Sequence, residues 1–399
     1  MVSTGQNAKF APFEPLAARE RNQVKITSIK ALQPKQGATL IRVETDAGLV
    51  GYGPCWESGP TARSVLASME TGRHQNLSLI GKDPLAIQVH FQNLFYRVRQ
   101  RGRYTGVFSA IDIALWDLAG KILGLPVSKL LGGNFRDEIA LYSHCQGGSV
   151  VTREAWRDCA QELLEDPRGF RAFKVDIHLP LGVPMQQFVP SIGTEGARKI
   201  HQSCMLAREA FGPDIDIIVH CHNELDVPSA IRVAEAVEPI KPLFFEDPLA
   251  PQFSEAWLAL RRATELPLMT GENLELADQV MPFLQAQAVD CLQPDLINCG
   301  GITGAKVIAD LAGLYRIPVC LHNVSGLALN LASQQFSAAV FNCPMMECRR
   351  DADQAPEAAS NVPVIKGGKM KVSTLPGLGL DLDQDYLKAN QAEGEPWWG

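Results

Sequence analysis

The first third of the chain carries two hydrophobic patterns in succession. Residues 24–33 (VKITSIKALQ) and 38–54 (ATLIRVETDAGLVGYGP) read as strands, with a turn at Asp46 to Gly48. From about Pro84 to Leu131, apolar residues instead recur every three or four positions, and Gly124 closes the clearest of these segments. The patterns predict a small antiparallel sheet followed by helices.

Beyond residue 138, short apolar runs alternate with helical segments. Eight such runs predict a closed (β/α)₈ barrel. A doubly wound open sheet is the main alternative, but no GxGxxG follows the first run and a polar residue closes nearly every run. After residue 361, strands and glycine turns return, so this tail is expected to rejoin the first sheet. The eight runs are IALYSHC, RAFKVDI, IDIIVHC, KPLFFEDP, LPLMTGE, VDCLQPD, IPVCLHN and NCPMMEC.

Composition narrows the function classes. The chain has 399 residues, 46% of them hydrophobic, which is enough for about two domains with a large core. The net charge of -7 argues against a nucleic-acid surface. The N-terminus has no apolar h-region and nowhere do eighteen apolar residues run together, so neither export nor membrane insertion is expected. Ten cysteines without a CxxC pair fit a reducing compartment, and we expect a cytoplasmic protein.

Polar residues close the predicted barrel strands. In a (β/α)₈ barrel the carboxyl ends of all strands meet at one cavity, whatever their separation in sequence. Burying so many charges without partners would be costly, so their convergence favours an active site over a purely structural barrel. The candidates are His144, Lys174, Asp176, His220, His222, Glu246, Glu272, Asp295, His322 and Glu347.

Two pairs among these candidates suggest specific chemistry. His220 and His222 alternate along one strand, so both project to the same side, about 7 Å apart, as paired metal-binding histidines often do. Asp295 and His322 end neighbouring strands about 5 Å apart. The carboxylate can therefore orient the imidazole and keep it basic, which favours a general base.

The motifs FFEDP, TGENL, QPDLINCGGITG, CLHN and MMEC occur in the order and spacing of strands four to eight of the enolase superfamily. Together with RVETDAGLVGYGP and the tail PGLGLDLD, they resemble its mandelate racemase/muconate lactonizing enzyme family over nearly the whole chain. The resemblance implies a TIM-like barrel with an α+β capping domain that the C-terminal tail completes. The expected parts are the capping domain at 24–138, the barrel at 139–360 and the returning segment at 361–399.

The resemblance also implies a shared reaction step. A divalent metal, usually Mg²⁺, binds the substrate carboxylate while a base removes the proton α to it, and the cation stabilises the resulting charge. The family's metal positions correspond to His220, Glu246 and Glu272. His220 is a departure, because the family ordinarily has Asp there. A neutral imidazole removes one negative charge, so Mg²⁺ should bind less tightly and Mn²⁺ should compete better.

Further roles follow from the same resemblance. His222 and His144 are similar to substrate-facing histidines of the mannonate-dehydratase-like acid-sugar dehydratases, and Glu347 matches an acid on the substrate carboxylate side. The strand-end histidine, His322, is then the base. The racemases carry K-x-K on the second strand, whereas this chain has Lys174 and then Asp176.

The second strand therefore favours loss of water over two-base racemisation. Asp176 or protonated His322 would act as the acid, and Lys174 would neutralise the carboxylate or tune Asp176. The substrate is expected to be a small-molecule carboxylate and the protein a homo-oligomer. Loops at Gly53 to Pro60 and at Arg103-Tyr104 should close the cavity.

Three alternatives stay open at this point. One is a racemase or epimerase of the same family. Another interprets residues 220–222 (HCH) as the H-x-H motif of a zinc hydrolase. Such an enzyme would need further histidines, but acids occupy most of the later strand ends. The third is a non-catalytic barrel in which His220 is a packed histidine and the metal site has weakened.

Overall fold

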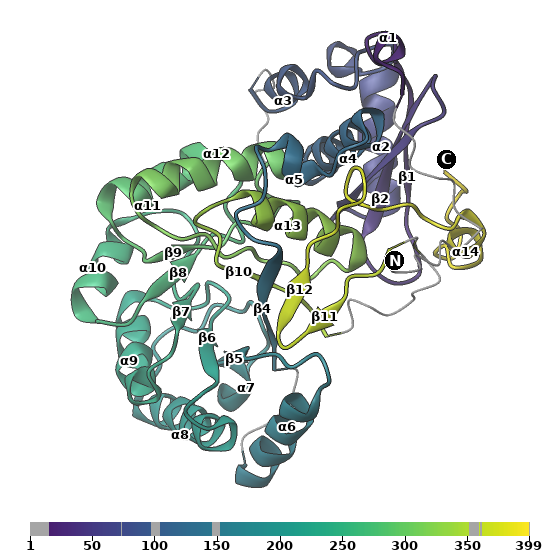
Figure 1. The fold of residues 1–399 in the computed structure, drawn as a ribbon. Helices are drawn as coiled ribbons and strands as arrows, with labels where there is room; N and C mark the ends of the chain where they lie inside the picture. Colours follow the sequence, from purple (N-terminus) through teal and green to yellow (C-terminus); the bar gives the residue numbers. More distant parts are fainter. Residues whose placement is uncertain are drawn as a thin grey trace.

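The computed structural model describes residues 16–72, 74–96, 104–145, 152–350, 359 and 361–398. They form a three-stranded antiparallel sheet and a larger sheet whose strands are wrapped by helices (Figure 1). Within the described part of the chain, every helix is too short or too polar to cross a lipid bilayer.

The N-terminal sheet contains β1 (Ile26–Leu32), β2 (Thr39–Thr45) and β3 (Val50–Cys55) in that order. Helix α4 (Thr105–Leu123) packs closely on β3, since a Cβ atom at Gly51 or Gly53 would clash with the backbone of Ala114 or Ala110. The helix ends at Gly124, whose φ of 70° is left-handed, as predicted. The other helices here are α1 (Ala18–Arg21), α2 (Gly59–Glu70), η1 (Gln75–Leu77), α3 (Ile87–Tyr96) and α5 (Val127–Leu130).

The larger sheet is a closed parallel barrel. Strands β4 to β9 pair in sequence order, and β10 pairs in parallel with β4. Single bridges from Val319 to Leu292 and from Leu321 to Met346 close the gap between β9 and β10. The predicted (β/α)₈-type fold is thus confirmed. The strands are β4 (Glu138–His144), β5 (Ala172–Asp176), β6 (Asp216–His220), β7 (Phe244–Glu246), β8 (Leu268–Thr270), β9 (Cys291–Leu292) and β10 (Met345–Glu347).

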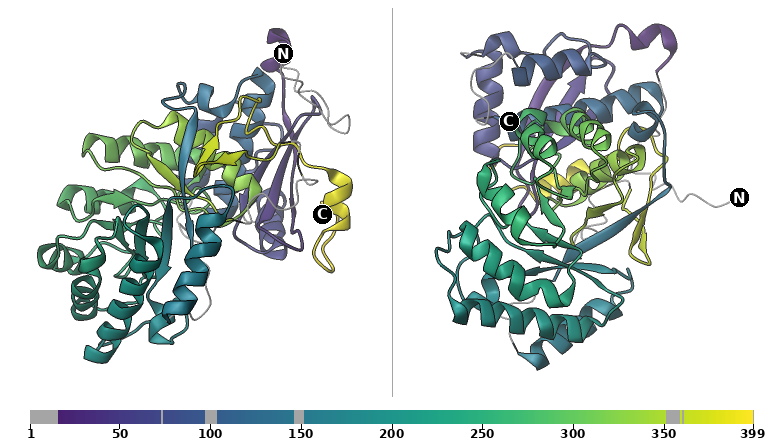
Figure 2. Two further views of the ribbon diagram at one scale, coloured as in Figure 1. Left: turned by 60° about the horizontal axis from the view of Figure 1, so that its bottom comes forward. Right: turned by 90° about the vertical axis from the view of Figure 1, so that its left-hand side faces the viewer.

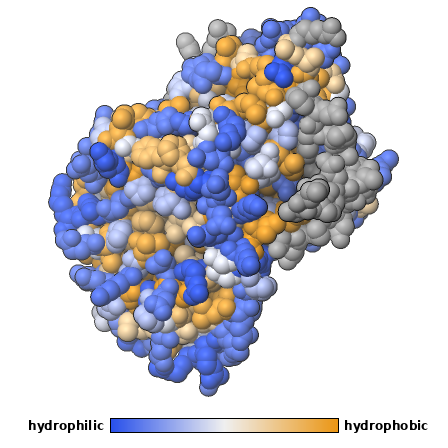
Figure 3. Space-filling model, viewed as in Figure 1, coloured by the Kyte–Doolittle hydropathy of each residue, from blue (hydrophilic) through white to orange (hydrophobic). Residues whose placement is uncertain are grey.

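Helices lie around the outside of the barrel (Figures 1 and 2). They are amphipathic: α9, for example, buries Ala230, Val233 and Val237. The outward faces are hydrophilic along the edges where α6, α8, α9 and α10 lie (Figure 3). The helices are α6 (Arg153–Glu165), α7 (His178–Leu181), α8 (Thr194–Phe211), α9 (Val227–Val237), η2 (Glu238–Ile240), α10 (Glu255–Ala263), α11 (Ala277–Ala286), α12 (Gly301–Leu314) and α13 (Leu327–Ala339).

The C-terminal tail contacts both parts of the molecule. Its hairpin, β11 (Ile365–Lys366) and β12 (Lys369–Lys371), extends the barrel sheet because β12 pairs antiparallel with the start of β4. The chain then reaches the N-terminal sheet, where α14 (Gln384–Ala389) lies beside β2 (Figures 1 and 2). There Arg42 donates a hydrogen bond of 3.3 Å to Gln384. The expected return to the first sheet is therefore preceded by a contact with the barrel.

Candidate active site

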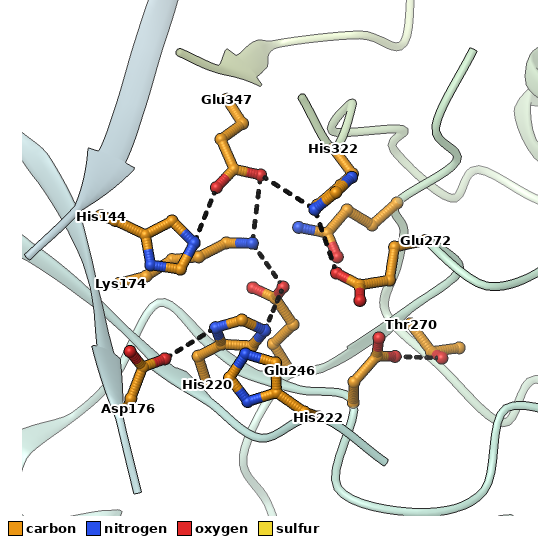
Figure 4. Close-up of polar contacts among 12 residues, drawn as sticks. His144, Lys174, Asp176, His220, His222, Glu246, Thr270, Glu272, His322 and Glu347 are labelled. Atoms are coloured by element: carbon orange, nitrogen blue, oxygen red, sulfur yellow. Dashed lines mark hydrogen bonds and ion pairs between the residues drawn. The ribbon is translucent and has the colours of Figure 1, made fainter. Parts of the chain in front are cut away.

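The ten residues singled out in the sequence lie in one connected group at the carboxyl ends of the barrel strands, and Figure 4 labels all of them except Asp295. Because these strands are parallel, their ends share one mouth. The residues are His144 on β4, Lys174 and Asp176 on β5, His220 on β6, His222 just after it, Glu246 on β7, Glu272 after β8, Asp295 after β9, His322 beside β10 and Glu347 on β10.

Three of these residues form a candidate metal site. His220, Glu246 and Glu272 are buried, and each offers one ligand atom within 4.8 Å of the others. Nε2 of His220, Oε2 of Glu246 and Oε2 of Glu272 are buried without a hydrogen-bond partner among the described residues. Unpaired buried donors and acceptors are costly. One imidazole nitrogen and two carboxylate oxygens within 4.8 Å of one another therefore fit a divalent cation.

His220 stands between two carboxylates, and this arrangement tests the fit further. Its Nδ1 lies 2.9 Å from Oδ1 of Asp176 and its Nε2 lies 3.3 Å from Oε1 of Glu246. Burial, and then the ammonium of Lys174, hold the pKa of His220 well below its usual range. A neutral ring has one N–H, so one of its nitrogens must turn a lone pair toward a carboxylate. The lone pair and the carboxylate repel each other, and a cation bound beside Glu246 would remove this repulsion.

Asp176 therefore lies behind His220 instead of projecting alone into the cavity. Its negative charge favours a proton on Nδ1 of His220, which leaves Nε2 free to act as a ligand. This position supports a role in orienting His220, in addition to the acid role expected from the sequence.

Lys174 is the buried cation of the site. Its Nζ donates to Oε1 of Glu246 at 2.6 Å and to Oε2 of Glu347 at 3.1 Å, and it lies between the two in Figure 4. Burial lowers the pKa of Lys174, but Glu246 and Glu347 outweigh it and hold the pKa above its usual range. The lysine uses one oxygen of Glu246 and leaves the other for a metal.

His322 and Asp295 form the predicted dyad. Nδ1 of His322 lies 2.6 Å from Oδ2 of Asp295, and Nε2 lies 3.3 Å from Oε2 of Glu272. Burial opposes protonation of the ring, but Glu272 and Glu347 raise the pKa of His322 to about 10. Because Glu272 is the largest raising cause, a cation bound to Glu272 would cancel much of this effect and favour the neutral, basic ring.

Glu347 links His144 on β4 with Lys174 and His322. One of its oxygens lies 3.1 Å from Nε2 of His144, and the other accepts from Lys174 and lies 3.9 Å from Nε2 of His322. Burial raises its pKa, but Lys174 and His322 outweigh this effect and hold the pKa of Glu347 well below the usual range. Glu347 is therefore an ionised carboxylate that contacts the side chains of His144, Lys174 and His322 and holds them in position.

Sequence reasoning missed two residues beside His222. The ring of His178 lies 5.5 Å from that of His222, centroid to centroid, and Glu224 is buried with Oε1 3.5 Å from Nδ1 of His222. Both missed residues lie two positions beyond a candidate, His178 after Asp176 and Glu224 after His222. The spacing was a usable signal, because a chain that leaves a strand end stays near the cavity for a few residues.

Two family models match the chain. The mandelate racemase/muconate lactonizing enzyme N-terminal domain matches residues 17–132, and the enolase C-terminal domain-like family matches residues 155–386. The chain belongs to the mandelate racemase/muconate lactonizing enzyme family of the enolase superfamily. The family predicted from the strand-end motifs is thus confirmed.

Individual relatives of this enolase-superfamily member align over most of its length. A D-xylonate dehydratase from Haloferax volcanii is 32% identical over 89% of this chain and 86% of that protein. A D-mannonate dehydratase from Sphingomonas sp. is 28% identical over 88% of this chain and 91% of that protein. The crystal structure of a mandelate racemase/muconate lactonizing enzyme-like protein from Rubrobacter xylanophilus matches with a TM-score of 0.84 at 30% identity, over 94% of this chain and 99% of that one.

Proposed function

We propose that this protein is a hydro-lyase that dehydrates an acid sugar, an aldonate, to a 2-keto-3-deoxy acid. His220, Glu246 and Glu272 would hold Mg²⁺ or Mn²⁺. One observation carries the proposal: Nε2 of His322, with its other nitrogen fixed by Asp295, lies 3.3 Å from Glu272 of the candidate ligand set. A base and a cation site thus lie side by side. The similarity to D-xylonate and D-mannonate dehydratases supports the substrate class.

The bound cation supplies electrostatic stabilisation of the negative charge that develops on the substrate carboxylate. His322 takes the proton from C2 on Nε2, while Asp295 holds Nδ1 and stabilises the imidazolium. The C2–H electron pair moves into the C1–C2 bond of an enediolate. Its return expels the C3 hydroxyl, which leaves as water after accepting one proton, and the enol then becomes the 2-keto acid.

The proton for the leaving hydroxyl has two candidate donors. His322 holds the abstracted proton and can return it, while Asp176 is the other acid expected at this mouth. The contact between Asp176 and Nδ1 of His220 favours His322, because the carboxylate is already used to orient the ring. Lys174 and Glu347 hold the carboxylate side of the cavity, and His144 and His222 offer polar contacts to hydroxyl groups.

A racemase or epimerase of the same family is the second candidate function. It needs a base on the opposite face of the substrate, where the racemases carry the second lysine of K-x-K. This chain has Asp176 in the place of that lysine, and the carboxylate faces His220, which argues against a second lysine base. All ten cysteines are free, which supports the expected reducing, cytoplasmic compartment. Homo-oligomer formation stays a prediction.

A screen of aldonates tests the proposal. Purified protein is incubated with Mg²⁺ or Mn²⁺ and each acid sugar, and 2-keto-3-deoxy products are measured, with Glu272→Gln as the metal-site control. Product with the native chain and none with Glu272→Gln supports dehydration. Inversion at C2 without loss of water would instead assign a racemase or epimerase, and no reaction with any carboxylate would favour a non-catalytic protein.

A further inference from the structure

A second group of metal-ligating side chains lies beside the first. Asp176, His178 and His222 each offer one ligand atom, and these atoms lie within 4.8 Å of one another. The group is separate from Glu246 and Glu272, and it contains His178, to which the proposed reaction gives no role. Two histidines and one carboxylate are a common ligand set for divalent transition metals that keep open coordination positions.

The unpaired atoms of this group point to a missing partner. Nδ1 of His178 and Nδ1 of His222 are buried, and neither atom makes a hydrogen bond within the part of the chain that the structure describes. The side chain of His222 is only 6% exposed. Nδ1 of His222 faces only Oε1 of Glu224, at 3.5 Å, and Nδ1 of His178 has no hydrogen-bond partner among the described residues, so a cation bound within reach of Asp176 would satisfy both rings.

The surrounding charge also favours a cation. Glu224 is buried beside His222, and its Oε2 has no hydrogen-bond partner among the described residues. Its Oε1 accepts a backbone hydrogen bond of 2.9 Å from Gln186, which fixes the carboxylate in place. This carboxylate adds negative charge next to the group without belonging to the three ligands.

The backbone holds the three ligands in place. Asp176 pairs with His220 in the register of β5 and β6, and the backbone N–H of Ile177 donates to the carbonyl of His220 at 3.1 Å. His178 follows directly and begins α7. Its position is therefore tied to β6, the strand that His222 follows.

We infer that Asp176, His178 and His222 form a second metal site, selective for a borderline-soft divalent ion such as Zn²⁺ or Co²⁺ over Mg²⁺. Imidazole nitrogens favour such ions, whereas Mg²⁺ prefers oxygen ligands. Asp176 can serve this site and still face His220, because a carboxylate has two oxygens. An ion here uses His222, so it would compete with the polar contact that His222 offers to a substrate hydroxyl group.

Counting bound ions tests the site without any activity measurement. Metal-stripped protein is equilibrated with Zn²⁺, or with Co²⁺ for its visible absorption, and the metal content per chain is determined. We expect about two ions for the native chain, one for His178→Asn, one for Glu272→Gln and none for the double variant. His74→Asn, a histidine in the N-terminal part, is the matched control and should keep two.

The outcomes separate this site from the first. Loss of one ion by His178→Asn, with an apparent affinity at least about 100-fold weaker at that site, supports the inference. An unchanged ion count and affinity in His178→Asn would overturn it. A native chain whose ions are all lost with Glu272→Gln would overturn it as well. Circular dichroism and thermal unfolding of the metal-free variants exclude a folding defect as the cause.

A second measurement addresses the consequence and rests on the proposed dehydration. With Mg²⁺ saturating, added Zn²⁺ should inhibit the native chain and inhibit His178→Asn at least about 10-fold less strongly. Equal inhibition of both would overturn the competition at His222. The ion count stands apart from this result, so a failure of the dehydratase assignment leaves the test of the second site intact.

Discussion

Asp295 and His322 face each other across neighbouring positions of the barrel, with Oδ2 of the acid 2.6 Å from Nδ1 of the imidazole. Both side chains are buried, and burial raises the pKa of Asp295 while the contact with His322 opposes this rise. The pair fixes the ring so that Nε2 is turned toward Glu272 and Glu347. This geometry suits a base that must hold one orientation while it takes a proton.

Replacing the base should stop proton abstraction. We expect His322→Asn to lower kcat by about 10² to 10⁴-fold, the usual contribution of a general base. It should also abolish exchange of the C2 proton with solvent deuterium, which NMR measures directly. Asp295→Asn keeps the imidazole but loses its orientation, so a smaller loss is expected. Full exchange at C2 in His322→Asn would exclude His322 as the abstracting group.

Placing at position 220 the carboxylate that the family resemblance implies there should strengthen Mg²⁺ binding. His220→Asp exchanges a neutral nitrogen for a hard anionic oxygen beside Glu246 and Glu272, so we expect Mg²⁺ to bind about 10-fold more tightly. The preference for Mn²⁺ over Mg²⁺ should fall in parallel. Calorimetry with both ions measures these affinities. Unchanged or weaker Mg²⁺ binding would contradict a ligand role for position 220.

The sequence predicts the barrel, and it also predicts which polar side chains the structure brings together at the mouth of the barrel, for a geometric reason. Each strand ends in a polar residue, and parallel strands bring all such ends to one mouth, so Lys174, Glu246 and Glu347 could be placed together without a structure. The same reasoning predicted the Asp295 and His322 pair. Family motifs then assigned the metal positions.

Other features depend on tertiary contacts that no local pattern carries. Whether Asp176 faces the substrate or His220 is decided by side-chain direction at the strand end, which residue spacing does not fix. The tail hairpin adds to the start of β4, a pairing between segments far apart in sequence. The seventh strand was predicted as a full run but forms single bridges with its neighbours. Pro294 lies between the bridged residues Leu292 and Asp295 and has no N–H to donate to the seventh strand. The cavity loop at Gly53 to Pro60 stays a prediction, and Arg103 of the other loop lies outside the described residues.

Removing the buried ammonium should destabilise the fold as well as the site. Lys174→Met leaves Glu246 and Glu347 buried without their shared cation, and breaking a buried pair in this way costs about 3 to 5 kcal/mol. Urea unfolding measures the loss. Lys306→Met is the matched control, because its pair with Asp310 is partly exposed on α12 and is worth only about 0.5 kcal/mol. Similar losses in both variants would show that Lys174 does not act as the counter-ion.

Asp112 on α4 should make stability depend on pH. It is buried, its Oδ2 accepts from the backbone N–H of Thr303 at 2.9 Å, and its Oδ1 has no hydrogen-bond partner in the described chain. Burial raises its pKa to about 7, against hydrogen bonds from Thr303 and Ile302 that lower it. Between about pH 4 and pH 7 the folded chain therefore holds a proton that the unfolded chain has lost. Stability should fall as pH rises through this window.

The variant Asp112→Asn removes this ionisation and isolates its effect. The free energy of unfolding of the native chain, minus that of Asp112→Asn, should fall by roughly 3 to 4 kcal/mol between pH 4 and pH 8, at about 1.4 kcal/mol per unit of pKa shift. Asp310→Asn, at an exposed position on α12, should give a nearly flat difference over the same range. A flat difference for Asp112→Asn as well would mean that the buried carboxyl keeps an ordinary pKa, and that α4 meets α12 around a carboxylate that is charged over most of this pH range.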